Sequence, residues 1–149
     1  MTRWTTIAAA LALGTVACGG IGFDERTGGD AGRGDSAALK IGPLVYDRVD
    51  APRGDNTDWK KFELEESGKV TLKVWWDEPK AAKAVVELFD EGGDRIEILK
   101  HDAADREEQI GPLKLKKGVW FVRVLASEGA STYTLKIVIA GGDDGGPSF

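Results

Sequence analysis

Apolar and polar residues alternate with a period of two along much of the chain, which is typical of β-strands that bury one face. The clearest case is residues 69–77, where Val70, Leu72, Val74 and Trp76 all fall on one side. The pattern predicts a strand with one face in a core and the other turned to solvent.

The same period recurs in further segments, which are separated by turn-forming pairs such as Ser67-Gly68 and Lys117-Gly118. We predict strands over residues 59–65, 84–89, 95–99, 109–115, 119–125 and 132–139. Seven or eight short strands at this spacing predict an all-β fold in the form of a sandwich. Trp76 and Trp120 share strand faces with valines, so we expect both rings in the core.

The first 17 residues have the features of a secretory signal peptide. Arg3 precedes an apolar run over residues 7–13, which is shorter than the roughly 20 residues that a membrane-spanning helix needs. Thr-Val-Ala-Cys at residues 15–18 resembles the lipobox of bacterial lipoproteins, in which cleavage precedes a lipidated cysteine. The resemblance implies a lipid anchor at Cys18 in the bacterial cell envelope. The alternative is ordinary signal cleavage nearby, without lipidation.

The remaining chain divides into three parts by composition. Residues 18–40 are rich in glycine and aspartate and poor in apolar residues, so we expect a flexible tether. Residues 41–139 form the folded domain, and residues 140–149 resemble the tether and are expected to be a disordered tail. Gly19 stands where enterobacterial lipoproteins retained at the inner membrane carry aspartate, and this resemblance favours the outer membrane.

Charge and reactive side chains exclude several classes of protein. The 149 residues carry a formal net charge of -5 with both signs interspersed, which argues against nucleic acid as a partner. One cysteine and one histidine exclude an intramolecular disulfide and a Cys/His zinc cluster. His101 has no nucleophile motif around it, and we expect it to be an exposed loop residue. Because no catalytic motif is present, we predict that the protein is not an enzyme.

Four motifs within residues 41–139 follow the order seen in the bacterial pre-peptidase C-terminal (PPC) domain. They are an acidic turn entering an aromatic strand at residues 55–62, an apolar-aromatic-Asp-x-x-Gly turn at 86–93, Gly-x-aromatic-x-Val-x-Val at 118–124 and Tyr-Thr-Leu at 133–135. The chain therefore resembles this family, although Lys60 stands where an aromatic residue is common. The resemblance implies a jelly-roll-like antiparallel β-sandwich in an exported, non-catalytic protein, and some members of the family bind calcium, collagen or carbohydrate.

Acidic residues gather in a loop-rich stretch before the first predicted strand. Calcium prefers carboxylate and carbonyl oxygens on flexible loops, so ligands of the right chemistry are present. Asp55 and Asp58 are the preferred calcium ligands, because they also sit at the acidic turn of the family. The alternative is a group of solvated, turn-forming aspartates. The full set is Asp47, Asp50, Asp55, Asn56 and Asp58.

A second candidate site is an aromatic patch on strand exteriors. Trp75 falls on the strand face opposite to Trp76, and Phe121 and Arg123 fall opposite to Trp120. If the two strands adjoin, Trp75, Phe121 and Arg123 form an exposed patch on which a sugar ring can stack. The alternative is that a second layer, or the stems of basic side chains, cover the rings.

These features predict a non-catalytic, lipid-anchored envelope protein whose β-sandwich is a binding module for a glycan or a protein ligand. The alternative is a structural or assembly subunit of an envelope complex or of a secreted-protease-associated system, with no small ligand. An exposed aromatic patch favours the first function, and a long unprotected edge strand favours the second. Calcium is optional in both.

Overall fold

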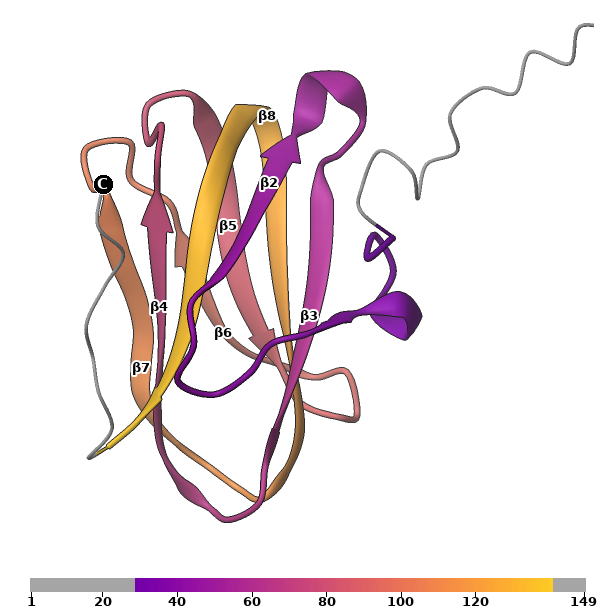
Figure 1. Cartoon of the computed structure of the whole chain (residues 1–149), viewed down its shortest axis with the longest axis vertical. Helices are drawn as coiled ribbons and strands as arrows, with labels where there is room; N and C mark the ends of the chain where they lie inside the picture. The colour runs from indigo at the N-terminus through magenta and orange to yellow at the C-terminus, as the bar shows by residue number, and fades with distance from the viewer. Residues whose placement is uncertain (1–28, 141–149) are drawn as a thin grey trace, which may run out of the picture.

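The computed structural model describes residues 29–140, which form an all-β sandwich (Figure 1). The predicted signal peptide, Cys18 and the tail beyond Ala140 lie outside the described residues. The elements are η1 (Arg33–Asp35), β1 (Ala37–Ala38), β2 (Val45–Asp50), η2 (Ala51–Arg53), β3 (Thr57–Leu64), β4 (Gly68–Trp76), β5 (Ala82–Phe89), β6 (Arg95–Lys100), β7 (Glu107–Leu115) and β8 (Gly118–Ile139), where η marks a short 3₁₀ helix.

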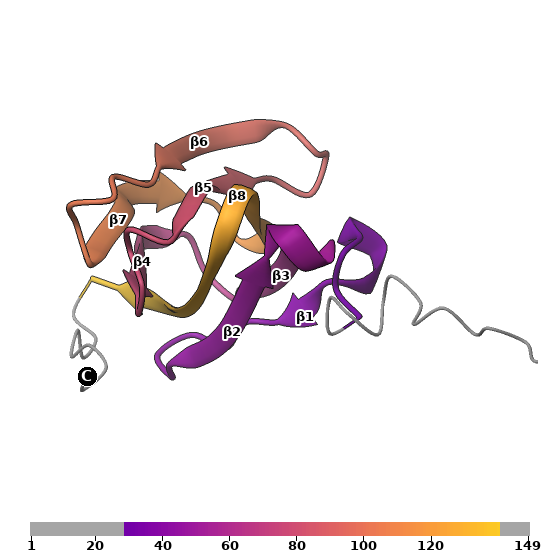
Figure 2. The same ribbon diagram turned by 90° about the horizontal axis from the view of Figure 1, so that it is seen from above.

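The strands form two sheets that share one strand. Sheet A has the order β1-β3-β8-β5-β6, and sheet B has the order β2-β8-β4-β7. Seen from above, β5 and β6 lie on one side, β2 lies on the other, and β8 crosses between them (Figure 2). The predicted jelly-roll-like antiparallel β-sandwich is confirmed, and the pairing of β1 with β3 adds one short parallel contact.

The long strand β8 joins the two sheets. Its first half pairs with β3 and β5, and its second half pairs with β2 and β4. The prediction of two separate strands over residues 119–125 and 132–139 is wrong in this respect, because the chain bends between them without reversing. The bend contains Gly129, whose φ is +73° and whose added Cβ would lie 1.6 Å from the Ala81 carbonyl oxygen. Only glycine fits this position.

The core lies between the two sheets and confirms the predicted period-two pattern. Trp76 is 0% exposed and Trp120 is 9% exposed, as expected from their strand faces. Removing these apolar faces from water is the main driving force for the packing of one sheet on the other. The cluster also contains Val70, Leu72, Val74, Val86, Leu88, Val122, Val124, Leu135 and Ile137.

The N-terminal segment packs on the sandwich, which corrects part of the predicted tether over residues 18–40. β1 pairs with β3, and Leu39 is 3% exposed within the core. Asp30 is also buried, and its carbonyl oxygen accepts a hydrogen bond from the Trp59 amide at 2.7 Å. A few apolar and charged contacts therefore order residues 29–40, although their composition resembles that of a linker.

β2 occupies residues 45–50, where no strand was predicted. Val45 and Val49 pack on the core, but Asp47 lies between them on the same side of the strand. This inward carboxylate interrupts the apolar period and hides the strand from pattern analysis. Within residues 29–140, none of the helices has the length and apolar character needed to span a membrane.

Candidate functional site

Three aromatic rings and an arginine lie together on the outer face of sheet A, the side turned away from the core. Trp59 comes from β3, Phe89 from β5, and Phe121 and Arg123 from β8. The strand register places Trp59 opposite Arg123 and Phe89 opposite Phe121. All four side chains are half-buried. We call these four residues the aromatic face.

Arg123 lies between two of the rings. Its guanidinium carbon is 5.3 Å from the ring centroid of Trp59 and 5.4 Å from that of Phe89. The two ring centroids are themselves 5.2 Å apart, with the planes tilted by 42°. These distances allow a cation–π attraction, so the arginine covers part of both rings and fixes their positions.

A buried carboxylate holds Arg123 in place. Glu87 on β5 is 2% exposed and accepts hydrogen bonds from Arg123 Nε at 2.6 Å and from Arg95 Nη1 at 2.8 Å. Hydrogen bonds between charged groups are the strong ones, and two donors satisfy both oxygens of the carboxylate. Because two cations share one anion, this arrangement leaves one unit of positive charge on the face.

Arg33 from η1 extends the aromatic face on the side of Phe121. Its guanidinium carbon lies 4.2 Å from the ring centroid of Phe121. Its Nη2 donates hydrogen bonds to the backbone carbonyls of Asp90, at 2.9 Å, and Glu91. Backbone carbonyls carry no net charge, so these bonds position the guanidinium without neutralising it.

An open groove of about 470 Å³ borders the aromatic face at Phe121. It runs between β1 and the paired strands β3 and β8. Its walls are mainly apolar, with one ammonium group and one carboxylate among them. The lining residues are Ala38, Leu39, Lys61, Phe62, Glu63, Val119 and Phe121.

The structure brings together only two of the three predicted patch residues. Phe121 and Arg123 lie on sheet A, whereas Trp75 lies on β4 of sheet B and is 3% exposed. The prediction required β4 to adjoin the first half of β8, but β4 pairs with the second half, and Trp75 is opposite Thr134. Trp75 is therefore separated from the aromatic face by the thickness of the sandwich.

Sequence reasoning missed Trp59, Phe89 and Arg33. Trp59 alternates with Asp58 and Lys60, two polar residues that point into the sandwich, so the inward side of this strand was not recognisable. The sequence did carry one sign of this face. Trp59 and Lys61 are two residues apart and therefore share one side of the strand, and the charge of Lys61 indicates the outer side. Arg33 was assigned to the predicted tether and had no such signal.

A second cluster of charged groups is buried between the sheets. The Lys60 ammonium, with 2% of its side chain exposed, donates to carboxylate oxygens of Asp30 and Asp47. The Tyr133 hydroxyl donates to Asp58 Oδ2 at 2.6 Å. We call this group the Lys60 cluster; its members are Asp30, Asp47, Asp55, Asp58, Lys60 and Tyr133.

The Lys60 cluster contains more carboxylates than cations, and this excess changes its protonation. Burial, with smaller contributions from Asp47 and Asp30, raises the pKa of Asp58 to about 8 despite the hydrogen bond from Tyr133. Burial and the neighbouring carboxylates raise the pKa of Asp55 to about 6. Asp58 is therefore largely protonated at neutral pH.

The two predicted calcium ligands, Asp55 and Asp58, are both buried in this cluster rather than exposed on loops. Asp58 lies in β3 against Tyr133, and the Lys60 ammonium is the cation of this cluster. Among residues 29–140, no group of three or more His, Cys, Asp or Glu side chains is arranged to hold a metal ion. The assignment of Asp55 and Asp58 as calcium ligands stays a prediction from the sequence.

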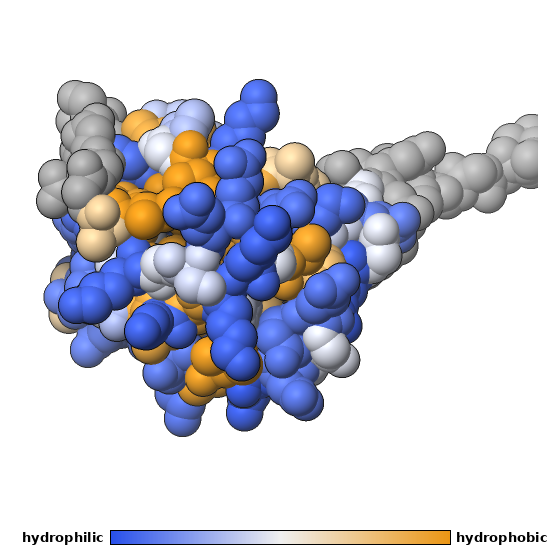
Figure 3. Space-filling view, turned by 90° about the horizontal axis from the view of Figure 1, so that it is seen from below, coloured by the Kyte–Doolittle hydropathy of each residue, from blue (hydrophilic) through white to orange (hydrophobic). Residues whose placement is uncertain are grey.

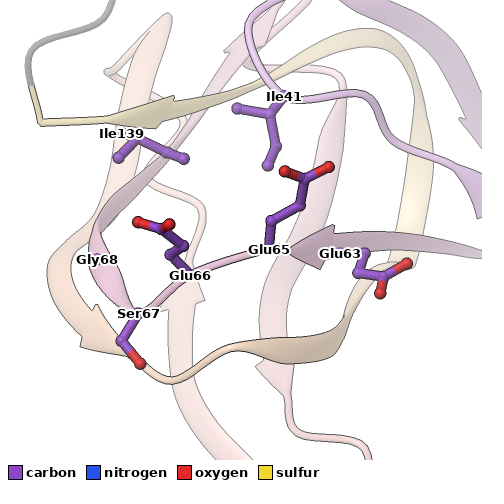
Figure 4. Close-up of a pocket in the computed structure, with 7 residues that line it drawn as sticks. All are labelled: Ile41, Glu63, Glu65, Glu66, Ser67, Gly68 and Ile139. Atoms are coloured by element: carbon purple, nitrogen blue, oxygen red, sulfur yellow. The ribbon is translucent and has the colours of Figure 1, made fainter.

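A pocket of about 400 Å³ lies at the end of the sandwich that holds the turn between β3 and β4. Glu65 and Glu66 point toward Ile41 and Ile139, whereas Glu63 points away from both (Figure 4). Viewed from this end, hydrophobic surface appears as separate patches between hydrophilic side chains (Figure 3). Glu63 also lines the groove beside Phe121, so the two hollows are neighbours, and the pocket has three carboxylates where the groove has one carboxylate and one ammonium group.

His101 is buried, which contradicts the expected exposed loop position. Its side chain is 0% exposed, with Nδ1 2.5 Å from Glu108 Oε2 and Nε2 2.7 Å from the Pro79 carbonyl oxygen. The ring also packs on Trp76, with the centroids 4.5 Å apart. His101 thus has a packing role between two loops and strand β7.

No protein-family model matches this chain, and no curated protein matches its sequence. The chain is similar in structure to the pre-peptidase C-terminal domain of a collagenase from Bacillus anthracis, with a TM-score of 0.58 and 14% identity over 68% of this chain and 93% of that one. It is less similar to PliG of Aeromonas hydrophila, a periplasmic inhibitor of g-type lysozyme, with a TM-score of 0.44 and 14% identity over 70% of this chain and 95% of that one. It is also less similar to a fucose-binding module of Streptococcus pneumoniae, with a TM-score of 0.39 and 15% identity over 74% of this chain and 82% of that one. The first of these likenesses shows that the described domain has a PPC-like fold.

Proposed function

We propose that this protein is an exported, non-catalytic envelope protein whose sandwich binds a ligand through the aromatic face. The observation that carries this proposal is the cluster of Trp59, Phe89, Phe121 and Arg123 on a sheet face that the other sheet does not cover. Half-buried rings at the surface of a domain are common anchors in recognition. The ligand is a glycan or a protein, and the mechanism is binding without turnover.

The signal peptide and lipobox features of residues 1–18 support the cell envelope as the place where this binding occurs. We propose that Cys18 is lipidated and holds the domain at the envelope, in the outer membrane, by its acyl chains. A single acyl chain binds a membrane only weakly, so stable anchoring needs two or more chains on the processed cysteine.

One observation favours the alternative of an assembly subunit. β6 pairs only with β5, and its six residues are mostly exposed, including Ile96 at 43%. An exposed edge of this kind can accept a strand from a partner. However, Arg95, Glu97 and Lys100 place three charges on this short strand, and charges are the usual protection against strand addition. We therefore give the aromatic face precedence.

Binding is tested with the full chain on a glycan array and, in parallel, with candidate envelope proteins by biolayer interferometry. The variant Phe121→Ala should weaken binding at least about tenfold, because it removes the ring that borders the groove. Tyr46→Ala is the matched control, since Tyr46 is an aromatic residue of sheet B that is 62% exposed. Equal loss in both variants, or binding that Phe121→Ala leaves unchanged, contradicts the proposed site.

The anchor is tested by the intact mass of the full chain expressed in a bacterial host, with and without inhibition of lipoprotein processing. A diacyl or triacyl mass on a chain that starts at Cys18 supports the proposal. An unmodified mass contradicts the anchor but leaves the aromatic face untouched, so the two parts of the proposal fail separately.

A further inference from the structure

The outer face of sheet A is positively charged in a chain whose formal net charge is -5. Strand alternation and η1 place six cations on this face: Arg33, Lys61, Lys83, Arg95, Lys100 and Arg123. Among the described residues, the strands of this face carry three carboxylates, Glu63, Glu87 and Glu128, and η1 carries a fourth, Asp35. Such an imbalance on one face attracts anions and repels cations.

Two of these cations lie beside Phe121 and form no ion pair with a carboxylate of the part of the chain that the structure describes. Lys61 is exposed and directly opposite Phe121 in the pairing of β3 with β8. Its ammonium has no ion pair among residues 29–140. Arg33 lies over the ring of Phe121 and, within residues 29–140, donates to the backbone carbonyls of Asp90 and Glu91. Both cations therefore keep their charge for a ligand, unlike Arg95 and Arg123, which share Glu87.

The groove beside Phe121, which Lys61 also lines, combines three kinds of contact. Val119 and Phe121 supply an apolar floor, Lys61 supplies an ammonium, and Glu63 supplies carboxylate oxygens that accept hydrogen bonds. An acidic sugar has matching groups: an apolar ring face, a carboxylate and several hydroxyls. A volume of about 470 Å³ lies within the range of pockets that hold small ligands.

Resting on the proposed function of the aromatic face, we infer that this groove binds a polysaccharide that carries carboxylate groups. The sugar carboxylate lies between Lys61 and Arg33, the ring packs on Phe121 and Val119, and hydroxyls donate to Glu63. The pocket with Glu65 and Glu66 at the end of the sandwich repels the negatively charged polysaccharide. The polysaccharide therefore runs across sheet A and away from that end.

The test uses the full chain in detergent and three soluble polymers: polygalacturonate, its fully methyl-esterified form and polyglutamate. Biolayer interferometry should show binding of polygalacturonate that falls as salt is raised, because exposed ion pairs are screened. Methyl esterification removes the charge and keeps the rings, so we expect at least about tenfold weaker binding of the ester. Polyglutamate keeps the charge and lacks the rings, and should also bind more weakly.

Matched variants identify the site. Lys61→Gln should weaken polygalacturonate binding about five- to tenfold by removing one charged contact. Lys114→Gln is the control, because Lys114 is an exposed lysine on β7 of sheet B and the substitution changes the net charge equally. We expect less than about a twofold change for this control, as for a surface charge away from the site. Urea unfolding of both variants verifies that neither loses stability.

The outcomes separate the inference from the proposed function. Binding of the neutral ester as tightly as polygalacturonate, with loss on Phe121→Ala, overturns the inference and keeps the aromatic face as the binding site. Equal losses in Lys61→Gln and Lys114→Gln show diffuse charge attraction and overturn the groove. Tighter binding of polyglutamate identifies an acidic protein segment as the ligand and overturns the polysaccharide. No binding of any polymer overturns the inference, and the proposed function is overturned as well if the glycan array is blank and the candidate envelope proteins also fail to bind.

Discussion

The aromatic face and the Lys60 cluster are ionic clusters of opposite composition. On the aromatic face one buried carboxylate, Glu87, accepts hydrogen bonds from two arginines, Arg95 and Arg123. Inside the sandwich one buried ammonium, Lys60, donates to two carboxylates, Asp30 and Asp47, with two more carboxylates nearby. The first cluster has too much positive charge for its partners, and the second has too much negative charge.

The excess charge has a different fate in each cluster because the arginines of the first reach water, whereas Asp58 of the second does not. The side chain of Arg95 is 52% exposed and that of Arg123 is 30% exposed, so water and a ligand can solvate the surplus charge. Asp58 is 0% exposed, and a proton neutralises it instead, since its pKa rises to about 8. The outer cluster is therefore suited to recognition, and the inner cluster sets stability and its dependence on pH.

Lys60→Met should have the largest effect, because it removes the ammonium that pairs with the buried Asp30. Removing one partner of a buried ion pair typically costs about 3–5 kcal/mol, so we expect a loss of this size in the free energy of unfolding at pH 7. The loss should shrink toward pH 5, where the abandoned Asp30 carboxylate, whose pKa burial already raises, takes up a proton. Urea unfolding at the two pH values measures it. Lys61→Met, at the exposed neighbouring position, should change stability by less than about 0.5 kcal/mol.

Asp58→Asn should remove much of the pH dependence of stability. The pKa of Asp58 rises from 3.8 to about 8 on folding, so between these values the folded state holds a proton that the unfolded state releases. The wild-type protein should thus be more stable near pH 4 and lose stability as the pH rises toward 8, by about 2–5 kcal/mol from this group. Thermal unfolding at pH 5 and pH 8 checks the slope.

In the Asp58→Asn variant a smaller slope should remain from Asp55, whose pKa is about 6, and from Asp30, whose pKa is raised by burial. Asp105→Asn is the control, because Asp105 is exposed. A variant that keeps the full wild-type slope would falsify the assignment of the proton to Asp58.

Glu87→Gln tests the outer cluster in the same way. The substitution keeps the shape of the side chain but removes the charge that Arg95 and Arg123 share. Hydrogen bonds to charged groups contribute about 1.5–3 kcal/mol, and part of the loss is recovered because both arginines reach water. We expect a loss of about 1–2 kcal/mol in urea unfolding, smaller than for Lys60→Met. Glu97→Gln on exposed β6 serves as the control, and an equal loss there contradicts the role of Glu87.

The strands of the core were predictable, because each buries one apolar face and so shows a period of two. β4 and the first half of β8 were recognised with their inward residues, including Trp76 and Trp120. β2 was not, because Asp47 points into the sandwich between Val45 and Val49. A buried ion pair thus breaks the pattern by which a strand is found.

The aromatic face was only half predictable, because periodicity shows which way a side chain points and not which strands are neighbours. Phe121 and Arg123 were correctly placed on one outer face, but Trp75 was joined to them on the assumption that their strands adjoin. That pairing depends on the path of β8 from one sheet to the other, and the local sequence carries little information on it. Arg33 was missed because its segment is ordered by contacts with residues far away in sequence.

Arg33→Ala should have the smallest of these effects and still separate the two clusters. Arg33 lies over Phe121 and ties η1 to the turn after β5 through the carbonyls of Asp90 and Glu91. A partly exposed cation–π contact contributes about 0.5–1 kcal/mol, so we expect a fall of a few degrees in the melting temperature. The slope of stability against pH should stay as in the wild type, because Arg33 does not contact the Lys60 cluster. Lys40→Ala, at an exposed position of the same segment, is the control, and a change in the pH slope on Arg33→Ala would show that the two clusters are coupled through the N-terminal segment.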